Sequence, residues 1–163
     1  ESGFKHDLSE EVDFTRVREF GRRLQEYGMG MVMIKAGKNG IYLKTPDISR
    51  LKSLTNISLT ADWTNREFWA ESVKPEYIAS STGAGDCAIA GFLAALIRGY
   101  KPAEALQLAA IAGYHNLKAV DAVSGLGGWE NLLADLQNEQ TNYIELDLNR
   151  LGFKREKKGL WSG

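Results

Sequence analysis

The most constraining feature of this sequence is a glycine turn that runs directly into an apolar, alanine-rich helix. Residues 80–86 read SSTGAGD, and residues 87–100 continue as CAIAGFLAALIRGY. The first N–H groups of a helix lack intrahelical partners, and the aligned peptide dipoles favour negative charge there. Because Gly83 and Gly85 carry no side chain, a phosphate can approach this backbone closely. The turn therefore predicts an anion site in front of a helix.

Asp86 stands where this turn becomes the helix, and two interpretations of it stay open. A carboxylate beside an anion site repels a resting anion, but it can serve as the base for a hydroxyl group that attacks phosphorus. In that interpretation the turn supports phosphoryl transfer to an alcohol. Alternatively, Gly83 and Gly85 only permit a turn and Asp86 only caps the helix, because aspartate is a preferred N-cap residue.

The same segment resembles the D-T-x-G-A-G-D signature of the PfkB family of carbohydrate kinases, which have a ribokinase-like fold. GAGD matches in full, and the helix of small residues follows as it does in the family. The resemblance implies that Asp86 is the general base and that the backbone donors of Gly83, Ala84 and Gly85 hold the transferring phosphoryl group. It also implies ATP and Mg²⁺ as cofactors and a sugar hydroxyl as the acceptor.

Two features depart from the family pattern. Ser80 stands where the family usually has an aspartate associated with a monovalent cation near the nucleotide phosphates, and Ser81 replaces a threonine. These changes weaken the expectation of potassium activation and leave the GAGD chemistry unchanged. The family's N-x-x-E motif, which helps to organise magnesium and phosphate, is not found. We expect it upstream of the helix that follows Asp13, before the start of this chain, and we assign no metal ligand here.

A second resemblance concerns the nucleotide side of the site. Residues 35–40 (KAGKNG) follow an apolar run at 29–34 and predict a hairpin, since Asn-Gly is a strong hairpin signal. This order resembles the family's v-v-v-T-x-G-x-x-G-x pattern, and it implies nucleotide contacts from Lys35, Gly37 and Gly40. A plain hairpin with a solvated lysine is the alternative. The resemblance also implies an adenine pocket shaped by Ala112, Asn116, Ser124 and Gly125.

Composition excludes several classes of protein. The chain has 163 residues, of which 44% are hydrophobic and 25% charged, with a net charge of −1. Near neutrality argues against a nucleic-acid partner or a polybasic membrane partner. No apolar run approaches the ~20 residues of a membrane span. The single cysteine, Cys87, excludes an internal disulfide and is expected to be a small packed residue. These features suit a cytoplasmic protein.

The order of the predicted elements favours an α/β fold with a largely parallel sheet flanked by helices. Helices are expected from Asp13 to Gly28, after Asp86, after Lys101 and from Trp129. The predicted strands are a buried parallel strand at 29–34, a returning hairpin strand at 41–44 and an edge strand at 67–71, with an irregular inserted loop at 45–63.

We predict that residues 1–139 are the C-terminal, nucleotide-binding and catalytic half of a ribokinase-like domain. Residues 140–163 have no counterpart in the family pattern and form a predicted extension, with an added strand at 143–148 and a mobile basic end at 154–158. Residues 1–11 are expected to be a disordered or docking lead-in.

GAGD lies mid-chain, whereas the family carries it in the last third of a longer chain. The expected partners are therefore the missing N-terminal half, a sugar and ATP, and a homo-oligomer is not excluded. We expect no kinase activity from this chain alone. A non-catalytic nucleotide-binding or regulatory module, and a nucleoside or hydroxymethylpyrimidine kinase of the same superfamily, are the alternatives.

Overall fold

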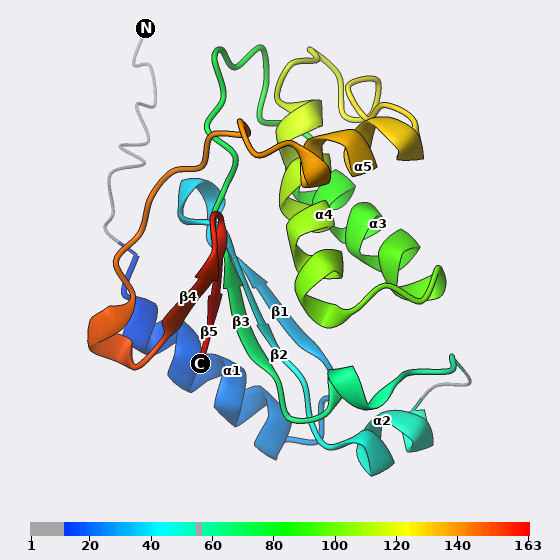
Figure 1. Cartoon of the computed structure of the whole chain (residues 1–163), viewed down its shortest axis with the longest axis vertical. Coiled ribbons are helices and arrows are strands. Elements are labelled where there is room, and N and C mark those ends of the chain that lie inside the picture. Colours follow the sequence, from blue (N-terminus) through cyan, green and yellow to red (C-terminus); the bar gives the residue numbers. More distant parts are fainter. Residues whose placement is uncertain (1–11, 55–56) are drawn as a thin grey trace, which may run out of the picture.

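The protein is an α/β structure built on one five-stranded sheet. The computed structural model describes residues 12–54 and 57–163, so the predicted lead-in at 1–11 lies outside the described residues. The strands lie in the order β1-β2-β3-β5-β4 (Figure 1). Their bounds are Val32–Lys35 for β1, Ile41–Lys44 for β2, Glu67–Ala70 for β3, Lys154–Lys157 for β4 and Leu160–Ser162 for β5.

The prediction of a largely parallel sheet is wrong, because every strand pair in this sheet is antiparallel. A tight turn over Gly37–Asn39 joins β1 to β2 as the predicted hairpin, and a parallel pair would need a long crossover instead. Helices cover both faces of the sheet, and Met33 packs against the cluster under α3 and α4 while Ile34 packs against the cluster under α1, although Met29 is exposed and Val32 is the one buried residue of the run at 29–34. Packing on both faces, and not strand direction, accounts for apolar residues at successive positions.

Helices lie on both faces of the sheet (Figure 1). Helix α1 (Phe14–Glu26) covers one face, and its N-cap Asp13 accepts a hydrogen bond from the N–H of Arg16 at 3.1 Å. Helices α3 (Ala84–Ile97), α4 (Pro102–Asn116) and α5 (Trp129–Gln137) lie on the other side. The part of the chain that the structure describes contains no helix long and apolar enough to cross a membrane.

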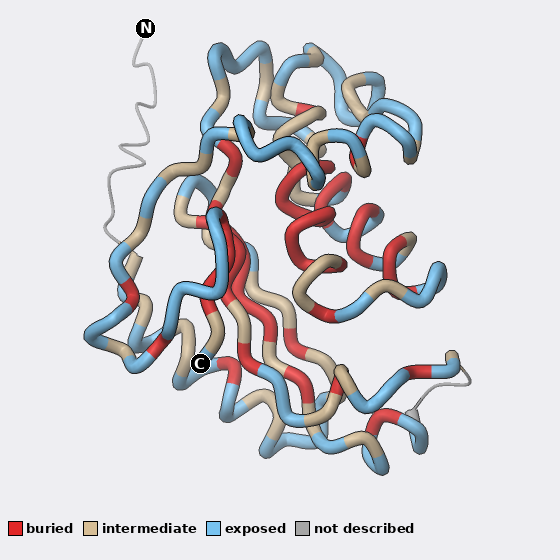
Figure 2. Tube along the Cα trace, viewed as in Figure 1, coloured by how far each residue is buried: buried red, intermediate tan, exposed pale blue. Residues whose placement is uncertain are grey.

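Side-chain alternation along the strands divides the core in two. Ile41 and Leu43 point toward α3 and α4, whereas Tyr42 between them points toward α1. Figure 2 shows the buried stretches along the strands and on the facing sides of α3 and α4. The smaller cluster, on the α1 side, contains Tyr42, Trp69, Leu148, Phe153 and Trp161, with Phe14 and Val17 packed against it.

Three local predictions are corrected by the structure. The predicted edge strand at 67–71 is β3, the third of five strands. The predicted irregular loop at 45–63 contains helix α2 (Ile48–Leu54) and a 3₁₀ turn at Ala61–Trp63. Residues 143–148 form no strand and contribute only an isolated bridge between Val73 and Tyr143.

The basic segment at 154–158, predicted to be mobile, forms strand β4, and β5 follows it. Strand β5 pairs with β3 and so extends the sheet beyond the strand that was expected at its edge. The carboxylate of Glu71, whose residue is fully buried, accepts hydrogen bonds from Arg155 at 2.8 Å and from the indole N–H of Trp161 at 2.9 Å. The segment is therefore fixed to the sheet by both backbone pairing and a buried carboxylate.

Candidate active site

The glycine turn begins α3 and leaves backbone donors open. Gly83 is the N-cap, in the left-handed region at φ 77°, and a Cβ there would lie 2.1 Å from the carbonyl oxygen of Ala122. Only glycine fits this position. Its carbonyl accepts the N–H groups of Asp86 at 3.0 Å and Cys87 at 2.8 Å. Within residues 12–54 and 57–163, the N–H groups of Gly83 and Gly85 donate to no protein acceptor, so both are available to an anion.

Asp86 lies in the first turn of α3 with its side chain exposed. The N-cap residue is Gly83, and no side chain caps this helix. Among the described residues the carboxylate of Asp86 forms neither a hydrogen bond nor an ion pair. The capping interpretation therefore has no hydrogen bond to support it, and the carboxylate follows directly on the open N–H group of Gly85 in the chain.

Lys35 brings a positive charge to the same turn from the end of β1. A Cβ on Gly85 would lie 2.6 Å from Nζ of Lys35. An ammonium group at a helix N-terminus faces the positive end of the helix dipole, which is unfavourable by itself. No carboxylate in the described part of the chain pairs with Lys35. A bound anion between the ammonium group and the turn would satisfy both.

The two hairpin glycines have different roles. Gly40 is buried, with φ 90° and ψ −151°, and a Cβ there would lie 2.0 Å from the carbonyl oxygen of Ala70 on β3. It is required for the sheet. Gly37 is exposed, and a Cβ there would meet nothing within 4 Å. Its carbonyl oxygen accepts a hydrogen bond from the hydroxyl of Ser72 at 2.9 Å, which ties the hairpin turn to the segment after β3.

Asn116 fastens the glycine turn to the end of α4. Its residue is fully buried, and its side-chain N–H group donates to the carbonyl oxygen of Thr82 at 2.8 Å. Gly125 packs against it, since a Cβ there would lie 2.7 Å from Cα of Asn116. In this structure the pair supports the turn. At the same end of α4, the carbonyl oxygen of Leu117 accepts a hydrogen bond from the N–H of Ala79 at 2.8 Å.

The other two residues assigned to an adenine pocket, Ala112 and Ser124, differ in their exposure. Ala112 is fully buried in the α3–α4 interface, where its Cβ would be 2.7 Å from a Cβ on Gly91. It lines no surface. Ser124 is exposed in the following loop, and its N–H donates to Asp121 at 2.6 Å. Hydrogen bonds from the N–H groups of Ser124 and Val123 hold the pKa of Asp121 below its usual range.

Cys87 is buried beside the turn, as its type suggested. Burial, together with the charge of Asp86, raises the pKa of its thiol, which disfavours the nucleophilic thiolate. Its Sγ lies 3.5 Å from the carbonyl oxygen of Ala122.

The sequence did not point to Ala122, whose backbone packs on Gly83, or to Thr82, whose carbonyl oxygen accepts the hydrogen bond from Asn116. Both act through the backbone, so their residue types give no signal. Gly113 of α4, a position within the small-residue stretch of this helix, also approaches the turn: a Cβ there would lie 3.1 Å from the carbonyl oxygen of Ala84.

The comparisons with known proteins identify the family of this chain. The profile described as pfkB family carbohydrate kinase matches residues 5–124. The chain belongs to this family. It contains the family's GAGD turn at residues 83–86, which starts α3 in the structure. No curated protein matches the chain.

Solved structures of a ribokinase and a riboside kinase share the fold. Ribokinase from Thermotoga maritima has a TM-score of 0.54 and 23% identity, over 77% of this chain and 37% of that one. The aminoimidazole riboside kinase of Salmonella enterica, solved with aminoimidazole riboside and an ATP analog, has a TM-score of 0.53 and 24% identity, over 80% of this chain and 38% of that one. The chain thus spans 31% to 38% of the length of the solved structures that it matches.

Proposed function

We propose that this chain is the nucleotide side, with the catalytic base, of an ATP-dependent kinase that phosphorylates a hydroxyl group of a sugar. One observation carries the proposal: the ammonium group of Lys35 lies against Gly85, opposite open backbone N–H groups, with the carboxylate of Asp86 next to them. Phosphoryl transfer depends mainly on positioning and on charge stabilisation, which these groups provide.

In the proposed reaction, Asp86 accepts the proton of the acceptor hydroxyl while the hydroxyl oxygen forms a bond to the γ-phosphorus of ATP. The bond from that phosphorus to the β,γ-bridging oxygen breaks, and ADP leaves. The N–H groups of Gly83 and Gly85 hold the equatorial oxygens of the transferring group, and Lys35 offers a point charge to the phosphates. The N–H of Ala84, also expected to hold the phosphoryl group, donates to the carbonyl oxygen of Ser81 at 3.3 Å, so the proposal assigns this role to Gly83 and Gly85.

The described residues do not fit a dedicated magnesium site. No group of three or more His, Cys, Asp or Glu side chains there is placed to hold a metal ion. We therefore propose that Mg²⁺ comes with the phosphates of ATP, and we assign no step and no ligand of this chain to it.

The acceptor-binding part is proposed to pack beside α3 and β1. Helix α3 has a single charged residue, Asp86, and is apolar on all sides, which is typical of a helix buried all round. Yet Ile89, Leu93 and Ile97 are 38%, 47% and 69% exposed. Strand β1 pairs only with β2 among the described strands, so its outer edge is open. Both features fit a further strand and helix that continue this α/β layer, as the length of the relatives suggests.

The chemistry of the acceptor is left at the level of a sugar hydroxyl. The Salmonella relative was solved with a riboside, so a sugar within a nucleoside is included in the proposal. A non-catalytic nucleotide-binding module would keep the turn and Lys35 and need no base. The two alternatives therefore differ in one requirement: a kinase needs Asp86 as a base, and a non-catalytic module does not.

The test is Asp86→Asn in the longer kinase that contains the acceptor-binding part. Asparagine keeps the size of aspartate and caps a helix about as well, but it cannot accept a proton as a carboxylate does. We expect turnover to fall by ~10²–10⁴-fold with little change in the Michaelis constant for ATP. Asp62→Asn, on the 3₁₀ turn before β3, is the matched control. Turnover retained in the Asp86 variant would remove its role as base.

A module is recognised by a different result. It would bind Mg-ADP in calorimetry but phosphorylate no sugar or nucleoside with Asp86 intact. The 163-residue chain alone is expected to show no sugar-dependent ADP release, because the acceptor-binding part is proposed to lie outside it.

A further inference from the structure

The C-terminal extension, residues 140–163, takes no part in the proposed reaction, yet the chain that follows β3 links it to the nucleotide side of the site. Hydrogen bonds join residues 71–74 to the hairpin turn at Gly37 and also to the extension at residues 142–144 and 159. The hairpin turn follows β1, which ends at Lys35, and the ammonium group of Lys35 lies against Gly85. The extension is therefore connected to the proposed phosphate site through one short segment.

Strand β3 and the residues after it hold the hairpin turn at three points. The indole N–H of Trp69 donates to the carbonyl oxygen of Asn39 at 2.7 Å, and a Cβ on Gly40 would lie 2.0 Å from a carbonyl oxygen of β3. The hydroxyl of Ser72 donates to the carbonyl oxygen of Gly37 at 2.9 Å. Trp69 is fully buried, whereas Ser72 is half-buried. The Ser72 contact can therefore be removed without changing the core.

The backbone of the same segment is held by the C-terminal extension. The N–H of Glu71 donates to the carbonyl oxygen of Gly159 at 3.0 Å, and the N–H of Ile144 donates to the carbonyl oxygen of Ser72 at 2.8 Å. Ser72 thus makes one hydrogen bond in each direction: its carbonyl accepts from the extension, and its hydroxyl donates to the hairpin turn.

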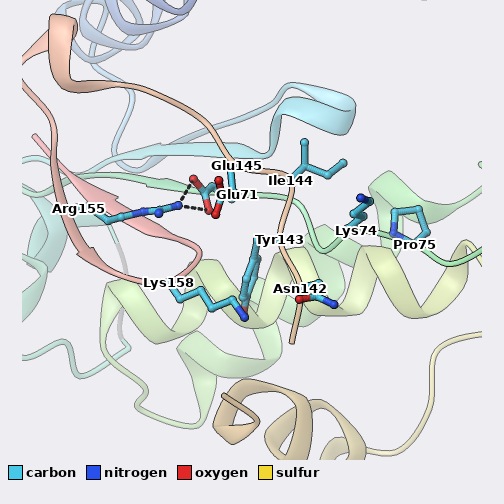
Figure 3. Close-up of a pocket in the computed structure, with 9 residues that line it drawn as sticks. All are labelled: Glu71, Lys74, Pro75, Asn142, Tyr143, Ile144, Glu145, Arg155 and Lys158. Atoms are coloured by element: carbon cyan, nitrogen blue, oxygen red, sulfur yellow. Dashed lines mark hydrogen bonds and ion pairs between the residues drawn. The ribbon is translucent and has the colours of Figure 1, made fainter. Parts of the chain in front are cut away.

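The carboxylate of Glu71, the residue before Ser72, is fully buried and accepts only from the extension. Nη2 of Arg155 contacts its two oxygens at 2.8 and 3.0 Å beside a pocket of about 780 Å³ (Figure 3). The indole N–H of Trp161 and the backbone N–H of Leu146 donate to Oε1 at 2.9 and 3.0 Å. A buried charge is costly to leave without its partners, so the extension fixes the backbone next to Ser72.

We propose that Ser72 is a positioning residue for nucleotide binding, and that the C-terminal extension acts through it. This inference rests on the proposed function, in which Lys35 offers its charge to the nucleotide phosphates. Ser72 holds the turn that follows Lys35, and so it holds the end of β1 in the position from which the ammonium group reaches Gly85. A binding group contributes fully only when the residues around it keep it in place before the ligand arrives.

The first experiment is a calorimetric titration of the 163-residue chain with Mg-ADP. Ser72→Ala removes the hydroxyl and should weaken binding by about threefold to tenfold, the range expected for one hydrogen bond. Ser72→Thr keeps the hydroxyl and should retain the affinity. The control is Ser53→Ala on α2, since the hydroxyl of Ser53 also donates to a backbone carbonyl oxygen, that of Arg50 at 2.7 Å. This control should leave the affinity unchanged, and both alanine variants should have similar midpoints of urea denaturation.

The longer kinase gives a second readout for Ser72. In that protein, Ser72→Ala should raise the Michaelis constant for ATP and leave the turnover number almost unchanged, because it alters the support of a binding group and none of the reacting groups. A residue that serves only the stability of the fold would not raise this Michaelis constant.

The role of the extension is tested by combining two substitutions. Arg155→Gln removes a partner of Glu71 and should weaken Mg-ADP binding when Ser72 is present, but it should add no further loss to Ser72→Ala, because the two residues act in series. Lys154→Gln removes the same charge from the neighbouring position of β4 and should change nothing. If Arg155→Gln fails to fold, Trp161→Phe removes the indole donor to Glu71 and should show the same dependence on Ser72.

Different results would overturn different parts of the inference. Unchanged affinity in Ser72→Ala, or an equal loss in Ser53→Ala, would remove the positioning role of Ser72. Independent losses from Ser72→Ala and Arg155→Gln that multiply in the double variant would remove the role of the extension. If the unmodified chain does not bind Mg-ADP, the proposed nucleotide site fails and this inference fails with it, which is a different result from binding that Ser72→Ala leaves intact.

Discussion

The ammonium group of Lys35 and the α-carbon of Gly85 lie in contact, so that a methyl group added to Gly85 would approach Nζ to 2.6 Å. One residue ends strand β1 and the other begins helix α3, and 50 positions of sequence separate them. This contact brings together the two parts of the family resemblance, the hairpin and the GAGD turn, and we propose that they bind one anion.

Removing the charge of Lys35 should weaken nucleotide binding. We expect Lys35→Gln to lower the affinity for Mg-ADP by about tenfold, because a charge-assisted contact to phosphate is lost. Lys38→Gln, in the same turn, is the control and should change little. Gly85→Val should abolish the calorimetric signal, since its side chain fills the approach to the open N–H groups. Unchanged affinity in both the Lys35 and the Gly85 variants would exclude this turn as the phosphate site.

The two hairpin glycines should differ in their effect on stability. Gly40→Ala places a Cβ 2.0 Å from the carbonyl oxygen of Ala70 in a backbone region used almost only by glycine. We expect it to lower the free energy of unfolding by more than about 2 kcal/mol in urea denaturation. Gly37 also has a positive φ, but a Cβ there would meet open space, so we expect Gly37→Ala to lower the free energy of unfolding by only about 1 kcal/mol. Equal losses would contradict the structural role of Gly40.

Acid should destabilise the α1 face of the sheet through Glu67. Burial alone would raise the pKa of this carboxyl, but hydrogen bonds from Arg18 and Tyr42 and the charge of Lys44 outweigh it and lower the pKa. A carboxyl with a lower pKa in the folded state stabilises the fold above its unfolded pKa of ~4.3, and this contribution is lost as the pH falls toward the folded value.

Urea denaturation between pH 6 and pH 3 checks this expectation. Glu67→Gln should be less stable than the unmodified chain at pH 6, and the difference should shrink below about pH 4. Glu76→Gln, which alters an exposed side chain, is the control. A difference that stays constant across this range would mean that the ionised form of Glu67 contributes nothing.

The exposed apolar side of α3 should become sensitive to substitution only in the longer kinase. In the 163-residue chain, Leu93→Gln with Ile97→Gln alters exposed side chains and should change the free energy of unfolding by no more than about 0.5 kcal/mol per site. In the kinase that includes the proposed acceptor-binding part, each buried side chain is worth about 1.5–3 kcal/mol. Similar small effects in both chains would show that nothing packs on this face. If the two substitutions instead reduce self-association of the short chain, a second copy of the chain packs on this face.

The sequence predicted the elements whose signals are local. Asp13 as an N-cap, the Asn-Gly hairpin at residues 39–40 and Pro102 at the start of α4 each act within a few residues. The glycine turn was recognised in the same way, and its four matching residues also gave the family that the profile confirms over residues 5–124.

Strand direction and strand order were not predictable from these signals. Successive apolar residues such as Met33 and Ile34 indicate packing on two faces, which antiparallel strands between two helical layers share with parallel strands. The segment at 154–158 is basic and was predicted to be mobile. Its pairing arises from the buried Glu71 and from the next strand, Leu160–Ser162, which packs on β3.

What the sequence by itself determined was chemistry carried by residue type over short distances: a turn that only glycine can make, a carboxylate in the first turn of a helix, and a lysine in a hairpin. Only the tertiary structure decided which of these groups meet. It placed Lys35 against Gly85, buried Ala112 between two helices, and gave Asn116 the task of holding Thr82. Contacts between distant residues depend on how whole faces pack, and no short stretch of sequence contains that information.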